Sequence, residues 1–272
     1  SSAASDVYKR QAQALAQLGV NRQRQRRYLD AFGAYQAALE ANTGDARIPV
    51  LYARYCLGLR RIEEGIEVLA GALEAGCRPR ASLWWEKGRL EVERGNWQAA
   101  VDDFQSILKA SSAGASSSGG PAAFSACLGL ARSLLELGKH APAAAAIERA
   151  RELSPMAWEP PYWEGRSLLL KGEPAASLLA FDRALRLCRE GKTEPPGDLA
   201  FAAIDAAYAM APYALAPDDA YTLGDRATDT IILVDGDGAS QIEPDRRKAI
   251  RSSLATVSYT HLRAHETRHD LV

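Results

Sequence analysis

The feature that most constrains this chain is a pattern of small and large residues that recurs about every 34 positions. Small residues separated by 34, 35, 43 and 34 positions stand at Gly19, Ala53, Gly88, Ala131 and Gly165. Twelve residues after each stands a second small residue, at Ala31, Gly65, Ala100, Ala143 and Ser177. Four residues further is a large apolar side chain, at Tyr35, Leu69, Phe104, Ile147 and Phe181. A repeat of this length predicts one supersecondary unit per period, stacked into an array.

Each unit is predicted to be a pair of helices. Small residues occur where two helices approach closely, because a larger side chain would push the axes apart. Glycines between the two helices, at Gly95, Gly138 and Gly172, can end the first helix in a left-handed conformation. The one long spacing of 43 contains the loop sequence 112–120, SAGASSSGG. A heptad coiled coil does not fit, because the small residues do not recur every seven positions.

Five units, starting near residues 12, 46, 81, 124 and 158, resemble the tetratricopeptide repeat family. The third unit carries the resemblance best, with Trp84, Gly88, Trp97, Ala100 and Phe104. The first unit departs from the pattern, because it lacks a glycine turn and has the basic stretch 22–27. The resemblance implies an all-α fold: a right-handed α-solenoid of helix hairpins over residues 12–191, with the first helices lining its inner surface.

Residues 192–255 are predicted to hold additional C-terminal helices after a short linker. Apolar or amphipathic patterns cover 199–211, 217–234 and 244–255. We interpret them as a degenerate sixth repeat followed by a cap, since a solenoid needs a terminal element with one polar face.

The two ends, residues 1–11 and 256–272, resemble the in-frame translation of sequencing adapters. We therefore expect both to be non-native, and the native termini to lie outside this sequence. His261, His265 and His269 have the i, i+4, i+8 spacing of metal ligands on one helix face. In an adapter-derived segment that spacing carries no functional meaning, so no metal site is predicted.

The resemblance implies that inward-facing positions on the first helices contact an extended peptide or a partner helix. One such position follows the first small residue of each unit and holds Val20, Arg54, Arg89, Arg132 and Arg166. Positions four residues earlier hold Val50, Trp85, Leu128 and Tyr162. The candidate peptide-binding residues are Arg54, Arg89, Arg132, Arg166, Trp85 and Tyr162. Guanidinium groups bind carboxylates through two parallel hydrogen bonds, which favours an acidic protein or peptide partner.

These residues could also have purely structural roles, as surface ion pairs or as packing between helices. Arg89 and Arg132 have Glu93 and Glu136 at i+4, and such surface ion pairs contribute only about 0.3–0.5 kcal/mol. Trp85 and Tyr162 could equally pack between helices. Some members of the family clamp a terminal carboxylate with Lys and Asn, but the corresponding positions here hold neither: Ala16, Val20, Leu51, Ser82 and Glu86.

Nothing in the sequence predicts an enzyme or a cofactor. It lacks the GxxxxGK[ST], HExxH and GxSxG motifs. The loop 235–245 is similar to a calcium-binding EF-hand loop, but Arg246 stands where the bidentate glutamate is needed. The 33 Lys and Arg residues balance 34 Asp and Glu residues, so neither nucleic acid nor a membrane surface is an expected partner.

The four cysteines are far apart and unpaired in pattern, which favours buried thiols and an intracellular, cytoplasmic location. We therefore expect a protein–protein interaction scaffold or adaptor that binds an extended, acidic peptide segment in its concave groove. The alternative is a regulatory or substrate-presenting arm of a larger enzyme. The sequence determines neither the partner nor the oligomeric state.

Overall fold

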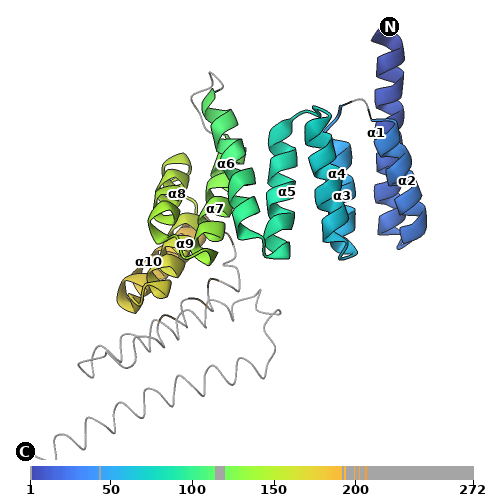
Figure 1. Cartoon of the computed structure of the whole chain (residues 1–272). Coiled ribbons are helices and arrows are strands. Elements are labelled where there is room, and N and C mark those ends of the chain that lie inside the picture. The colour runs from blue at the N-terminus through green and yellow to red at the C-terminus, as the bar shows by residue number, and fades with distance from the viewer. Residues whose placement is uncertain are drawn as a thin grey trace, which may run out of the picture. The chain divides into compact units, whose positions relative to one another are not determined.

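The computed structural model describes residues 2–42, 44–113 and 120–191, together with residues 193, 199, 202 and 206. These residues form the ten α-helices labelled α1 to α10 and no strand (Figure 1). The helices are α1 Ser2–Arg24, α2 Tyr28–Glu40, α3 Arg47–Gly58, α4 Ile62–Glu74, α5 Arg80–Arg94, α6 Trp97–Ala113, α7 Pro121–Glu136, α8 His140–Leu153, α9 Glu159–Leu170 and α10 Pro174–Glu190.

The helices pair into five hairpins that match the five predicted units. Within each hairpin the two helices pack on each other, as α1 does on α2 and α9 on α10. In the first four hairpins, the second helix of one also packs on the first helix of the next, and consecutive first helices touch. The fold is therefore an all-α solenoid of helix hairpins, as the repeat spacing predicts.

The chain divides into two compact units, Ser1–Leu153 and Ser154–Val272. The first unit holds the four hairpins from α1 to α8, and the second holds α9 and α10. The division falls within the predicted repeat segment 12–191.

Three small residues of the repeat, Gly19, Gly88 and Gly165, lie against an aromatic ring of the same hairpin. A Cβ atom added to Gly88 would lie 3.0 Å from Phe104, and one added to Gly165 would lie 2.5 Å from Phe181. A Cβ atom added to Gly129 of α7, which the repeat pattern does not include, would lie 2.6 Å from the same ring. Phe104 is thus held between α5 and α7, so close packing joins neighbouring hairpins as well as the two helices of one.

The turns within the hairpins have a residue with a positive φ angle. Gly95, Gly138 and Gly172 have φ values of 79°, 69° and 78°, which confirms the predicted left-handed helix ends. In the first two hairpins the same place is taken by Arg26 and Arg60, with φ values of 59° and 60°.

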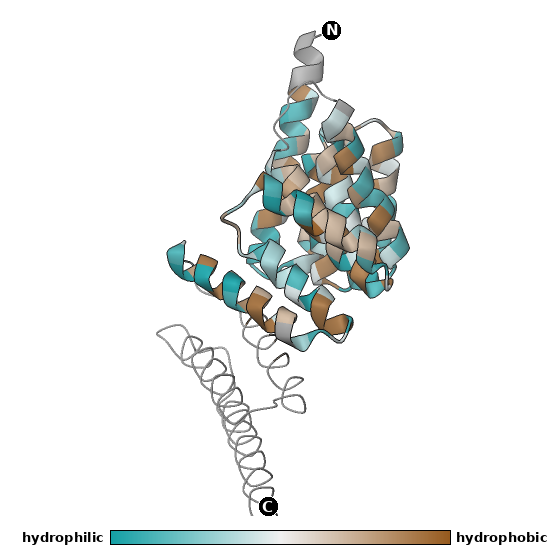
Figure 2. Cartoon of the chain, turned by 90° about the vertical axis from the view of Figure 1, so that its left-hand side faces the viewer, coloured by the Kyte–Doolittle hydropathy of each residue, from teal (hydrophilic) through white to brown (hydrophobic). Residues whose placement is uncertain are grey.

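The helices are amphipathic, and hydrophobic residues alternate with hydrophilic ones around them (Figure 2). In α1 the buried face begins at Ala12, which is 1% exposed, while residues 7–11 are all exposed. The helix thus passes through residues 7–11 of the predicted adapter-derived segment without burying their side chains.

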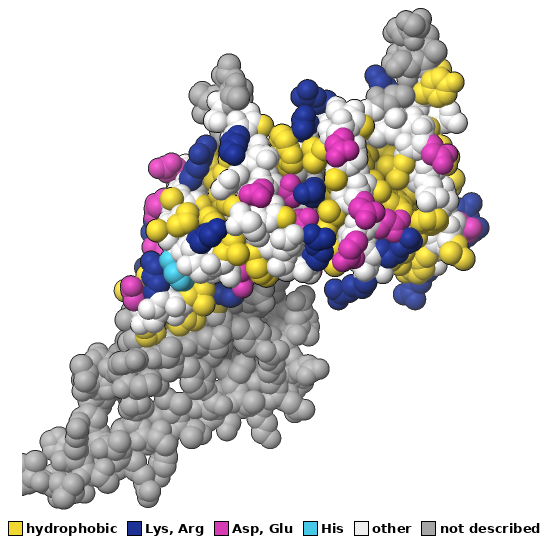
Figure 3. Space-filling model, in the orientation of Figure 1, with side chains coloured by type: hydrophobic (Ala, Val, Ile, Leu, Met, Phe, Trp, Pro, Cys, Tyr) yellow, Lys and Arg dark blue, Asp and Glu magenta, His cyan; other side chains and the backbone are white. Residues whose placement is uncertain are grey.

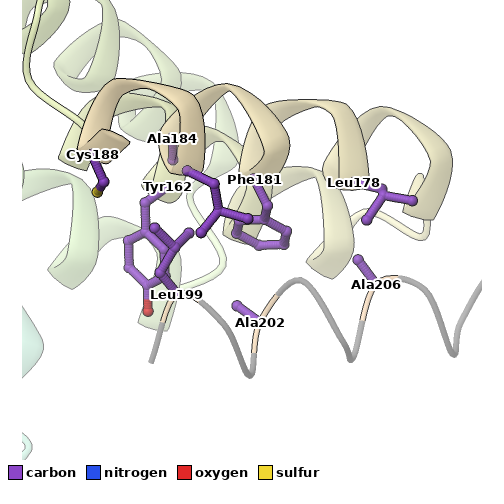
Figure 4. Close-up of a cluster of buried hydrophobic side chains, with 9 residues drawn as sticks. Tyr162, Leu178, Phe181, Ala184, Cys188, Leu199, Ala202 and Ala206 are labelled. Atoms are coloured by element: carbon purple, nitrogen blue, oxygen red, sulfur yellow. The ribbon is translucent and has the colours of Figure 1, made fainter. Parts of the chain in front are cut away.

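Three residues beyond α10 belong to the core of the second unit. Leu199, Ala202 and Ala206 are helical and buried in one hydrophobic cluster with Tyr162 and Phe181 (Figure 4). Their spacing of three and four residues places them on one face of a helix. The C-terminal helical segment predicted from residue 199 therefore has at least these residues packed against the fifth hairpin.

The remaining predictions for the C-terminal part lie outside the described residues. They comprise most of the linker and helices of 192–255, the loop 235–245, and the segment 256–272 with its three histidines. Within the part of the chain that the structure describes, no helix is both long enough and apolar enough to cross a membrane.

Candidate functional site

The first helices of three consecutive hairpins line a groove in the first unit. This groove has a volume of about 520 Å³ and lies between α3, α5 and α7. Its walls are largely apolar, with Val50, Leu51 and Trp85 as the large side chains. The other lining residues are small or basic: Arg47, Arg54, Ala81, Ser82, Pro121, Ala122 and Ser125.

Trp85 is half-buried and has two roles in this geometry. Its ring packs against Phe104, with 5.4 Å between the ring centroids and 52° between the planes. It also lines the groove. Trp85 therefore both packs between helices and contributes a surface to the groove.

A buried carboxylate holds two of the candidate arginines. Glu86 on α5 is 0% exposed, and its Oε2 accepts a hydrogen bond of 3.0 Å from Nε of Arg54 on α3. Arg89 Nη2 lies 3.0 Å from the other oxygen, Oε1, without hydrogen-bond alignment. The side chains of Arg54 and Arg89 remain 53% and 41% exposed. Both guanidinium groups therefore keep surface that a ligand can reach.

This arrangement differs from the surface pairing that the spacing suggests. Arg89 is paired with Glu86, three residues before it, rather than with Glu93. Arg54, which has no acidic residue at i+4, finds its partner on the next first helix, 32 residues away. A short-range sequence pattern does not contain that contact.

Arg132 lies on α7 with an exposed side chain. Among the described residues, Arg132 forms no ion pair with Glu136 or with any other carboxylate. Arg132 also does not line the groove. Its charge is thus free but lies outside the groove that contains Arg54.

The two remaining candidates, Tyr162 and Arg166, lie in the second unit. Tyr162 is 7% exposed and packs against Trp163 and Phe181, with ring centroids 5.1 and 6.0 Å away. Its hydroxyl accepts a hydrogen bond of 3.3 Å from Nη1 of Arg166. The structure therefore gives Tyr162 a packing role, and the row of four arginines is divided between the two units.

Charges of both signs are intermixed over the surface that Figure 3 presents. Even the buried charges are paired: Lys87 Nζ lies 2.9 and 3.1 Å from the two carboxylate oxygens of Asp103. Burial raises the pKa of Asp103, and the hydrogen bond from Lys87 acts in the opposite direction. A surface of mixed charge gives no general attraction for ligands of one sign.

The four cysteines are all buried and free, as predicted. Burial raises the pKa of each thiol, and for Cys56 the pKa reaches about 11. A thiol with a raised pKa is a poor nucleophile. In the described part of the chain, no group of His, Cys, Asp and Glu residues could hold a metal ion.

A stack of helix hairpins whose first helices line a groove defines a helical-repeat interaction protein. Residues 50–115 and 128–192 match the family model described as tetratricopeptide repeat. The chain belongs to the tetratricopeptide repeat family. Family and fold together support a protein–protein interaction scaffold.

Several solved structures share the fold. A tetratricopeptide repeat protein from Parabacteroides merdae is 14% identical, with a TM-score of 0.65, covering 92% of this chain and 88% of that one. PilW, a type IV pilus biogenesis factor, is 14% identical, with a TM-score of 0.64 and coverages of 88% and 98%. YrrB is 21% identical, with a TM-score of 0.50 and coverages of 72% and 92%. No curated protein matches the sequence.

Proposed function

We propose that this protein is a non-catalytic scaffold that holds an extended, acidic segment of a partner protein in the groove between α3, α5 and α7. The observation that carries the proposal is the composition of this groove. It combines apolar side chains with two arginines, Arg47 and Arg54, in a volume of about 520 Å³. YrrB, which shares the fold, is described as having an unusual peptide-binding site, and this supports a peptide as the kind of ligand.

The apolar residues would supply most of the binding free energy. Val50, Leu51 and Trp85 can bury side chains of the ligand, and aromatic residues in a pocket commonly dominate an interface. The packing of Trp85 on Phe104 fixes its ring before the ligand arrives. A fixed side chain loses little conformational entropy on binding, which favours affinity.

The arginines would select for acidic residues. The buried Glu86 holds Arg54 at the groove, while about half of the Arg54 side chain stays exposed. The guanidinium group has five N–H donors, so one hydrogen bond to Glu86 leaves others for a carboxylate of the ligand. Arg47, whose side chain is 70% exposed, is a second cation at the same groove, and Asp45 holds it through an ion pair of 2.7 Å.

The test is the affinity of a fluorescein-labelled peptide of alternating glutamate and leucine, measured by fluorescence anisotropy. Ser82→Trp fills the groove without removing a contact, since Ser82 is exposed and lines the groove. We expect this variant to weaken binding by about 10-fold or more, the loss of roughly 1.4 kcal/mol. Arg47→Ala should weaken binding less and reduce its dependence on salt, because one charged contact is removed.

The matched control is Arg149→Ala, which removes one exposed arginine from α8, outside the groove. It should leave the affinity unchanged. Thermal unfolding of each variant would show that the fold is kept. If Ser82→Trp binds the peptide as tightly as the parent protein, the groove is not the binding site and the proposal fails.

A further inference from the structure

The turns of the first two hairpins contain arginine where the other three contain glycine. Arg26, between α1 and α2, and Arg60, between α3 and α4, have φ values of 59° and 60°. The left-handed region is unfavourable for any residue with a Cβ atom, and glycine avoids this cost. Residues other than glycine in such conformations occur preferentially at functional sites, where the side chain is needed.

Both turns border a single pocket. Its volume is about 390 Å³, and its lining comes from the end of α1, the start of α2 and the end of α3: Val20, Gln23, Arg24, Tyr28, Tyr55, Gly58 and Leu59. The Tyr55 hydroxyl donates a hydrogen bond of 2.8 Å to the backbone oxygen of Tyr28, which fixes one wall. Tyr28 itself is 45% exposed. Tyr55 is only 2% exposed, so the aromatic surface next to the two arginine turns is chiefly that of Tyr28.

Positive charge is concentrated at these turns. They carry six arginines: Arg22, Arg24, Arg26, Arg27, Arg60 and Arg61. Among the described residues only Arg27 and Arg61 have carboxylate partners, Asp30 and Glu64. Four arginines at this edge thus have no carboxylate partner there, in a chain whose formal net charge is −1.

Helix ends do not account for this arrangement. The C-terminal ends of α1 and α3 favour nearby cations, which explains arginine in the last helical turn. The same benefit is available at ordinary helical positions, as Arg22 and Arg24 show. It does not require Arg26 or Arg60 in a left-handed conformation.

We propose that this edge, defined by Arg24, Arg26, Arg60, Tyr28 and Tyr55, is a second binding site for an acidic polypeptide segment, separate from the groove. An apolar or aromatic side chain of the ligand enters the pocket beside Tyr28. Carboxylates on either side of it pair with the arginines. A polypeptide fits better than nucleic acid, because it can place an apolar side chain in a pocket that Val20, Tyr28 and Leu59 line.

The experiment uses the full chain with Ser82→Trp, so that a groove site cannot contribute. The probe is a fluorescein-labelled peptide with four glutamates on each side of one tryptophan, and its affinity is measured by anisotropy. The test variant is Arg26→Gly with Arg60→Gly, and the control is Arg26→Lys with Arg60→Lys. The glycine variant removes the charges but suits the backbone, so it should unfold a few degrees higher than the parent.

We expect the glycine variant to lose about 10-fold or more in affinity, and the lysine variant to retain most of it. Unchanged affinity in the glycine variant, or no binding to the Ser82→Trp parent, overturns the second site and leaves the groove proposal untouched. A lower unfolding temperature in the glycine variant overturns the argument from backbone conformation. If a labelled single-stranded oligothymidine binds in place of the peptide, and is lost in the glycine variant, the polypeptide proposal is wrong.

Discussion

Gly129→Ala tests the packing that joins the third hairpin to the fourth. The new Cβ atom would lie 2.6 Å from Phe104, roughly 1 Å closer than the usual contact between carbon atoms. Phe104 cannot easily move away, because its ring is also packed closely on Gly88, where an added Cβ atom would lie 3.0 Å away. Overpacking of this kind costs about 1–3 kcal/mol, and the helix propensity of alanine over glycine returns about 1 kcal/mol. We expect a net loss of up to about 2 kcal/mol.

The matched control is Gly33→Ala in α2. No atom lies within 4 Å of its added Cβ, so only the gain in helix propensity of about 1 kcal/mol remains. Urea unfolding followed by circular dichroism should thus show opposite signs for the same chemical change. Combining Gly129→Ala with Phe104→Leu should recover part of the loss, since the smaller side chain makes room. If both alanine variants change stability in the same direction, the contact with Phe104 does not limit the packing.

Three further predictions concern individual side chains. Replacing both Arg54 and Arg89 with alanine should destabilise the protein more than Glu86→Gln does, as measured by urea unfolding. Without the arginines the buried carboxylate of Glu86 has no partner, whereas without Glu86 the exposed arginines are solvated by water. The pKa of Asp45 is lowered, chiefly by a hydrogen bond from Arg47. The stabilisation from Asp45 is therefore complete above its ordinary pKa of about 3.9 and is lost as the pH falls through the lower pKa of the folded state. The difference in unfolding free energy between the parent protein and Asp45→Asn should shrink below about pH 4. The Cys56 thiol, with a pKa near 11, should not react with Ellman's reagent at pH 8 until the protein is unfolded in urea, and rapid reaction of the folded protein would contradict its burial.

The charge pattern of the candidate site illustrates how a repeat can mislead. The equivalent positions of Arg54, Arg89 and Arg132 suggest three similar side chains, yet their surroundings differ. Two share the buried Glu86 and the third has no ion pair within the described chain. The position of a residue in the repeat determines where its backbone lies in the hairpin. The partners of its side chain depend on the residues that the neighbouring hairpins place beside it.

The sequence by itself determined the hairpins and their order. The spacing between a glycine such as Gly88 and a ring such as Phe104 is 16 residues, about the distance from one helix to the next across a short turn. Packing within a hairpin depends only on helical periodicity and on side-chain size, both of which are written in the local sequence. The glycine turns were predictable for the same reason, because a left-handed helix end is a local property of the backbone.

Only the tertiary structure decided which residues meet between hairpins. Glu86 bonds to Arg54 across 32 residues, Gly129 approaches Phe104 from the next hairpin, and Tyr162 is buried instead of facing a groove. These contacts depend on the distance and rotation between helices that are packed as whole units. Periodicity determines neither the distance nor the rotation. Helices that differ by a small rotation still bury the same apolar face, but they bring different polar residues together.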